Sequence, residues 1–211
     1  KCKNKIPFYN NIPILSYIIQ KGKCAKCHNK FSYQYPLIEL LMGIIFVLSY
    51  HIIYPLNSIE PIFFSIMSGI LICIAVIDYN FFIIPLSLLL FGIIINIPFI
   101  IFFSSNSIYT HLYGSLFGLG YLSIVFILTW FFTKKQPLGF GDLQLIILLG
   151  IWLGPFKVLL TIFFGSILGL IYLLIISLFS GYPKNPKLPF GTFLCIASII
   201  IYLIPTNWEF I

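Results

Sequence analysis

The sequence predicts an all-α fold: a polytopic integral membrane bundle of about seven transmembrane helices, preceded by an N-terminal cytoplasmic segment that contains cysteines. Two observations lead to this prediction. Of the 211 residues, 60% are hydrophobic and only 8% are charged, whereas a soluble domain carries about 25% charged residues. The apolar runs also approach the ~20 residues that an α-helix needs to cross a bilayer. The composition therefore excludes an ordinary soluble domain.

The chain divides into two predicted domains at residue 34. Residues 1–34 are polar and rich in lysine, and we interpret them as a cytoplasmic segment with a partial zinc-type motif. Residues 35–211 are almost entirely apolar, with clusters of Pro, Gly, Ser and Asn between the runs, as expected for spans joined by loops. The predicted spans are 35–53, 61–77, 83–103, 111–132, 141–153, 156–179 and 188–204. The fifth falls below the usual minimum of about 17 residues, so we expect it to begin at the interface or cross a thinned part of the bundle.

Lysine positions predict the orientation. The chain has a net charge of +7 and contains no arginine. If the N-terminal segment is cytoplasmic, this topology places every lysine except Lys157 on the cytoplasmic side, in agreement with the positive-inside rule. The loops thus account for the positive charge, and we expect the bilayer rather than a nucleic acid as the partner.

Carboxylates are rare in this chain, which has only five. Glu60 and Glu209 fall near outer helix ends, where solvation accounts for them. Asp78 ends the second predicted span and Asp142 opens the fifth, both on the cytoplasmic side. Because a charge in or near a bilayer costs several kcal/mol unless it is paired or solvated, these two aspartates are functional candidates.

Two aspartates at one membrane depth suggest an aspartyl dyad. When two carboxyl groups share a site, one keeps its proton while the other is charged, so the pair can activate water and protonate a peptide carbonyl. The alternative is that Asp142 only caps the helix that follows it. Gly139 and Gly141 favour the dyad, because such a permissive backbone lets another chain approach the carboxylate, and we therefore name both as candidate substrate-binding residues.

Several motifs occur in a fixed order along the chain. They are Tyr35-Pro36-Leu37-Ile38-Glu39-Leu40, Ile77-Asp78 with Pro85 seven residues after the acid, Gly139-Phe140-Gly141-Asp142, and Pro189-Phe190-Gly191 with Phe193. This ordered set resembles the motifs of the type IV prepilin leader peptidases, a family of polytopic membrane aspartyl proteases, over nearly the whole chain. Asn80, Leu86 and Gln144 depart from it, because the family often has Asp at the first two positions and Lys at the third.

The resemblance implies a function. Asp78 and Asp142 would be the catalytic pair of an aspartic-type endopeptidase. The substrates would be prepilin or pseudopilin precursors, whose basic leader is cut at the cytoplasmic face of the bacterial inner membrane. Many family members also N-methylate the new N-terminus with S-adenosylmethionine. The family normally begins with a further transmembrane helix and a first C-x-x-C pair, so we expect this chain to lack that helix and the first Cys.

The N-terminal segment holds a candidate metal site. Cys24 and Cys27 have the C-x-x-C spacing that presents two thiolates to one zinc ion, and Cys2 is a candidate third ligand. A cytoplasmic location favours zinc binding over a disulfide. Since tetrahedral zinc takes four ligands, a site that stays empty and thiols that stay unpaired are open alternatives.

Other functions compete with the peptidase. Glu39 lies one turn into the first span, where it could face the dyad, bind basic residues of the leader or pair with a lysine; we favour a substrate-binding or structural role. A proton-coupled transporter or channel also uses intramembrane acids, but its acids more often lie near mid-bilayer. A catalytically inactive scaffold is a third possibility.

Overall fold

The computed structural model describes residues 7–53, 59–104, 107–134, 139–180 and 188–204. Over these ranges the regular elements are helices, and the only pairing of extended backbone is an isolated antiparallel bridge between Lys23 and Lys30. The chain forms two compact units, residues 1–65 and 66–211. The predicted all-α class is therefore confirmed.

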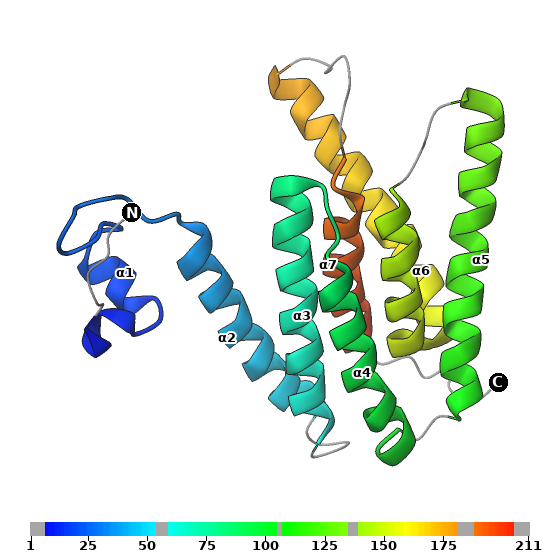
Figure 1. The fold of residues 1–211 in the computed structure, drawn as a ribbon, viewed down its shortest axis with the longest axis horizontal. Helices are drawn as coiled ribbons and strands as arrows, with labels where there is room; N and C mark the ends of the chain where they lie inside the picture. Colours follow the sequence, from blue (N-terminus) through cyan, green and yellow to red (C-terminus); the bar gives the residue numbers. More distant parts are fainter. Residues whose placement is uncertain (1–6, 54–58, 105–106, 135–138, 181–187, 205–211) are drawn as a thin grey trace. The chain divides into compact units, whose positions relative to one another are not determined.

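The first unit contains the 3-10 helix η1 (Phe8–Asn11), the short helix α1 (Leu15–Ile19) and the apolar helix α2 (Gln34–Ile52) (Figure 1). A hydrogen bond joins its polar segment to α2: the backbone N–H of Ile14 donates to Glu39 Oε2 at 2.7 Å. Ile14 is the N-cap residue of α1 and has no side-chain capping bond of its own. Glu39 therefore satisfies a backbone donor at the start of α1.

The second unit begins within α3 and contains the remaining helices (Figure 1). They are α3 (Glu60–Phe81), α4 (Leu86–Phe102), α5 (Ile108–Thr133), α6 (Phe140–Ser180) and α7 (Phe190–Leu203). Helix α6 is central, because it packs against α4, α5 and α7. Its approach to α5 is close: a Cβ added to Gly150 would lie 2.5 Å from the carbonyl oxygen of Gly114. Only glycines allow two helix backbones to come this near.

Helix α6 contains a kink at the predicted break between the fifth and sixth spans. Gly154 has φ 77° and ψ 177° there, a conformation that only glycine adopts readily. Pro155 follows and has no N–H to donate to the carbonyl of Ile151, four residues earlier. His111 of α5 replaces that donor, since its Nδ1 lies 2.7 Å from the Ile151 carbonyl oxygen, while its Nε2 lies 3.1 Å from Ser104 Oγ. A carbonyl only accepts, so Nδ1 carries the proton.

The lengths and apolar composition of the helices agree with the predicted membrane protein. Among the residues with defined positions, α2, α3, α5 and α6 are long and apolar enough to cross a membrane, and α4 and α7 are shorter apolar helices. Each predicted span has a helical segment at its position, with the fifth and sixth joined through the α6 kink. The boundaries differ by up to four residues, most at the end of the second span, which was predicted at residue 77 whereas α3 continues to Phe81. Asp78 therefore lies inside the last turn of a helix.

Candidate active site

Asp78 is held at the end of α3 by the beginning of α7. Its side chain is buried, with 5% of its surface exposed. Thr192 donates its backbone N–H to Asp78 Oδ2 at 2.7 Å and its hydroxyl at 3.0 Å. Thr192 is the third residue of α7, where the backbone N–H groups have no partner within the helix. The N-terminus of α7 thus supplies donors, and a favourable helix dipole, to a buried carboxyl group.

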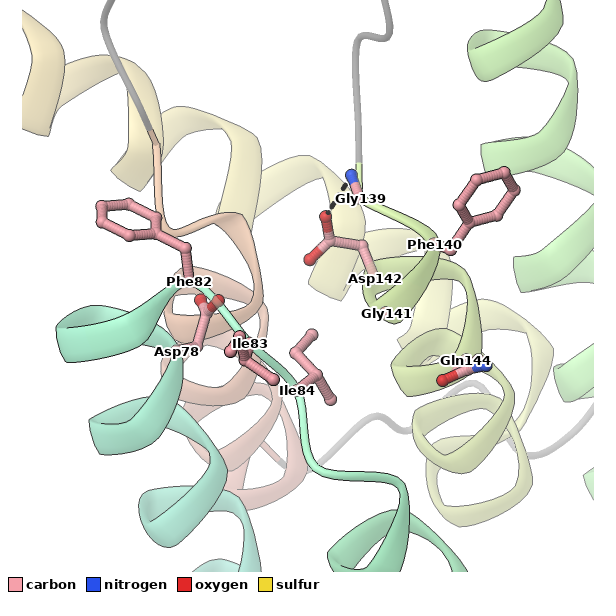
Figure 2. A pocket seen from close by; sticks show the side chains of 9 residues that line it. All are labelled: Asp78, Phe82, Ile83, Ile84, Gly139, Phe140, Gly141, Asp142 and Gln144. Atoms are coloured by element: carbon pink, nitrogen blue, oxygen red, sulfur yellow. Dashed lines mark hydrogen bonds between the residues drawn. The ribbon is translucent and has the colours of Figure 1, made fainter.

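Asp142 lies in the first turn of α6 and is also buried, at 7% exposed. Its Oδ2 accepts the backbone N–H of Gly139 at 3.1 Å (Figure 2). Gly139 immediately precedes the helix, so this bond is the reciprocal half of a capping box. Asp142 therefore makes a capping contact through Oδ2, but from the third position of the helix rather than as its N-cap residue.

Gly191, the second residue of α7, shows how close the two carboxyl groups are. A Cβ built on Gly191 would lie 3.1 Å from Asp78 Oδ2 and 3.3 Å from Asp142 Oδ1. Both oxygens thus face the same backbone position of α7, so the two carboxyl groups border one small space. The two acids are 64 positions apart in the sequence, yet the first turn of α7 lies close to both.

The two aspartates open into one pocket of about 290 Å³ (Figure 2). Apart from Asp78, Asp142 and the amide of Gln144, its walls are apolar side chains and glycines. Its lining residues are Asp78, Phe82, Ile83, Ile84, Gly139, Phe140, Gly141, Asp142 and Gln144. A pocket with apolar walls and a few convergent polar groups is the usual form of a substrate site.

The loop after α3 forms part of this wall. Phe82 follows the helix with φ 55° and donates its backbone N–H to the Asp78 carbonyl at 2.7 Å. Left-handed backbone is unfavourable for a bulky residue, and such strain concentrates at functional sites. The turn directs Ile83 and Ile84 past the aspartates (Figure 2).

The two predicted glycines have different surroundings. A Cβ on Gly141 would lie 3.0 Å from Ile84 Cβ, so this glycine lets the start of α6 approach the loop after α3. A Cβ on Gly139 would make only an ordinary contact, 3.4 Å from Asp142 Oδ2. Phe140, between them, points away from Asp142 toward α5, where its ring centroid lies 5.9 Å from that of Phe126 (Figure 2). This contact anchors the beginning of α6.

The predicted zinc ligands are only partly described. Cys2 lies outside the described residues. Cys24 and Cys27 occupy a tight turn, in which the backbone N–H of His28 donates to the Cys24 carbonyl at 3.0 Å. Within the described ranges no group of three or more His, Cys, Asp or Glu side chains could hold a metal ion. Since tetrahedral zinc needs four ligands, the described residues do not by themselves fit a zinc site.

Sequence reasoning missed two residues of the aspartate site. The motif Pro189-Phe190-Gly191 was noted, but neither Gly191 nor Thr192 was assigned a role. The only available signal was their position, because both fall where a helix begins after Pro189, and the first turn of a helix attracts carboxylates.

Comparisons with known proteins found two family models that match this chain. A model of the bacterial peptidase A24 N-terminal domain matches residues 1–53, and a model of the type IV leader peptidase family matches residues 65–174. Among the relatives are proteins named prepilin leader peptidase/N-methyltransferase. The one from Pseudomonas aeruginosa is 33% identical over 96% of this chain and 69% of its own length. The one from Dichelobacter nodosus is 32% identical over 96% and 68%, and the one from Legionella pneumophila is 31% identical over 94% and 69%.

No solved structure matches the chain. The predicted resemblance is confirmed by the family models and by these relatives. The transporter interpretation is not favoured, since the matching family consists of peptidases. The chain belongs to the type IV leader peptidase family of aspartic peptidases.

Proposed function

We propose that this protein cleaves the leader peptide of type IV pilin-like precursors and that Asp78 and Asp142 are its catalytic pair. The observation that supports this pair is that both carboxyl groups approach Gly191, where a Cβ would lie 3.1 Å from Asp78 Oδ2 and 3.3 Å from Asp142 Oδ1. The relatives' names supply the substrate class, prepilins. Both side chains are buried yet line one pocket, as a peptidase needs if it is to exclude bulk water and admit a peptide.

The proposed reaction uses one carboxyl group as base and the other as acid. A water between Asp78 and Asp142 loses a proton to the charged carboxylate and attacks the carbonyl carbon of the scissile peptide bond. The protonated carboxyl group donates to the carbonyl oxygen. When the tetrahedral intermediate breaks down, the C–N bond breaks and the leaving amine takes up a proton.

Three residues are proposed to bind the substrate. Gly139 and Gly141 line the pocket beside Asp142, where the absence of side chains leaves room for a peptide backbone. Glu39 is exposed, and its bond to Ile14 uses only one of its two carboxylate oxygens. We propose that its charge attracts the basic residues of the leader.

The cellular location of the protein, N-methylation and zinc binding are also proposals. The lysine distribution supports a bacterial inner-membrane protein whose N-terminal segment, residues 1–34, lies in the cytoplasm before a transmembrane peptidase domain, residues 35–211. The relatives' names support N-methylation of the new N-terminus with S-adenosylmethionine. No residue in the described ranges is assigned to that cofactor, so we derive no step through it. Zinc bound by Cys2, Cys24 and Cys27 stays a hypothesis without support from the described residues.

Cleavage of a prepilin in membranes tests the proposed function. The protein should release the leader, whereas Asp78→Asn and Asp142→Asn should each reduce cleavage by about 10⁴-fold or more, because losing one member of a catalytic unit disables it. Both variants must accumulate in the membrane like the unmodified protein. Cleavage retained by either variant would refute the pair. Proton flux without a peptide product, stopped by the same substitutions, would support a transporter instead.

A further inference from the structure

Thr192 makes the closest polar contacts to Asp78. Its backbone N–H lies 2.7 Å and its hydroxyl 3.0 Å from the same oxygen, Asp78 Oδ2. Both side chains are buried, with 8% of Thr192 and 5% of Asp78 exposed. Two donors on one oxygen of a buried carboxyl group restrict the rotation of that group about its last side-chain bond.

The Thr192 hydroxyl also contacts the backbone of α3. Thr192 Oγ1 lies 3.0 Å from the backbone carbonyl oxygen of Ala75, three residues before Asp78 on the same helix. A hydroxyl has one proton, so the two acceptors compete for it. The backbone N–H of Thr192 has no such alternative, and it keeps Asp78 Oδ2 as an acceptor whichever way the hydroxyl turns.

The other carboxylate oxygen has different surroundings. Among the described residues, no donor reaches Asp78 Oδ1 within hydrogen-bonding distance. Since Asp78 lines the pocket, this oxygen is left for water or substrate. Asp78 Oδ2 is thus held by α7 and also faces Asp142 Oδ1 beside Gly191, while Oδ1 accepts no hydrogen bond from the described residues.

We propose that Thr192 is a positioning residue of the peptidase reaction, which uses its hydroxyl to hold the Asp78 carboxylate in the orientation that faces Asp142. This inference rests on the proposed catalytic pair and adds a residue to it. Thr192 is not proposed to contact the substrate or to transfer a proton; it acts through Asp78. Its loss should therefore reduce kcat and leave the binding of the leader, and hence KM, nearly unchanged.

Thr192→Val tests this inference, because valine keeps the shape and the backbone N–H while removing the hydroxyl. Prepilin cleavage should show a kcat lower by about 10- to 100-fold, the effect of one hydrogen bond to a charged group, with KM within about twofold. Thr192→Ser keeps a hydroxyl and should restore kcat to within about threefold of the unmodified protein. If the valine variant does not accumulate in membranes, Thr192→Ala removes the same hydroxyl without a branched side chain.

Thr161→Val is the matched control. Thr161 of α6 is fully buried, and its hydroxyl donates to the carbonyl of Lys157 at 2.9 Å, a bond within one helix. Its substitution should leave kcat unchanged. A Thr192→Val protein with the unmodified kcat, or a Thr192→Ser protein as slow as the valine variant, would overturn the inference while leaving the aspartate pair intact. If Asp78→Asn itself cleaves, the proposed function fails instead.

Discussion

Replacing Gly191 with alanine tests the geometry of the aspartate pair, because it adds a single methyl group beside both carboxyl groups. The new Cβ would lie 2.7 Å from Ile84 Cδ1, 3.1 Å from Asp78 Oδ2 and 3.3 Å from Asp142 Oδ1. Carbon atoms in contact prefer about 3.5–4.0 Å, so Ile84 must shift. Because Ile84 Cδ1 is the end of a flexible side chain, the fold can absorb that shift. The methyl group then occupies the space between the carboxyl groups.

The size of the effect follows from what the methyl group displaces. It would contact both carboxylate oxygens and take space from the water that is proposed to lie between them. Moving a reacting group by about 1 Å costs about 100-fold in rate, which corresponds to about 2.7 kcal/mol of transition-state stabilisation. We expect Gly191→Ala to reduce kcat by at least about this factor. Alanine favours a helix by up to about 1 kcal/mol over glycine, which partly offsets the overlap with Ile84, so the protein should still fold.

Prepilin cleavage by the purified variant in detergent or vesicles gives the rate, and thermal unfolding monitors the fold. Gly120→Ala in α5 is the matched control, because outside its own helical turn no described atom lies within 4 Å of a Cβ added there. It should cleave at the unmodified rate. A folded Gly191→Ala protein that also cleaves at the unmodified rate would show that the space between the carboxyl groups is not where the reaction occurs.

Two further predictions concern the helices that support the site. His111→Leu should leave the Ile151 carbonyl without its donor and lower the free energy of unfolding by about 1–3 kcal/mol, measured by thermal or denaturant unfolding in detergent; an unchanged stability would mean that His111 does not stabilise the kink. Gly150→Ala places a Cβ 2.5 Å from the backbone oxygen of Gly114 and should destabilise the protein by about 3 kcal/mol or prevent accumulation. Gly43→Ala should do neither, because no described atom beyond its own helical turn lies within 4 Å of a Cβ added at Gly43.

The helices could be predicted from sequence because hydrophobic runs and their interruptions are local features. Gly154 and Pro155 predicted a break, and the structure has a kink there. The end of α3 was placed too early because Asp78 and Asn80 interrupt the apolar run. The helix continues through them because polar side chains there find partners: Asn80 donates to the Val76 carbonyl at 2.7 Å, within its own helix, and α7 donates to Asp78.

The aspartates of the candidate site could be found from sequence, but the residues around them could not. Asp78 and Asp142 stand out because acids are rare in an apolar chain. Gly191 and Thr192 are common residue types, and their importance depends on how α7 packs against α3 and α6. Such a long-range contact leaves no periodic pattern in one sequence. The role of His111 could not be predicted either. It depends on the Ile151 carbonyl, which lacks a donor within its helix because Pro155 has no N–H.

The claim that Asp78 and Asp142 act as one unit is tested most directly by comparing single-turnover prepilin cleavage in three proteins: Asp78→Asn, Asp142→Asn and the double variant. If the carboxyl groups share one water and one proton, either substitution already disables the site, and the three residual rates should agree within about threefold. If the two losses instead multiply, so that the double variant is far slower than either single variant, the carboxyl groups act independently and the account of a shared site is wrong.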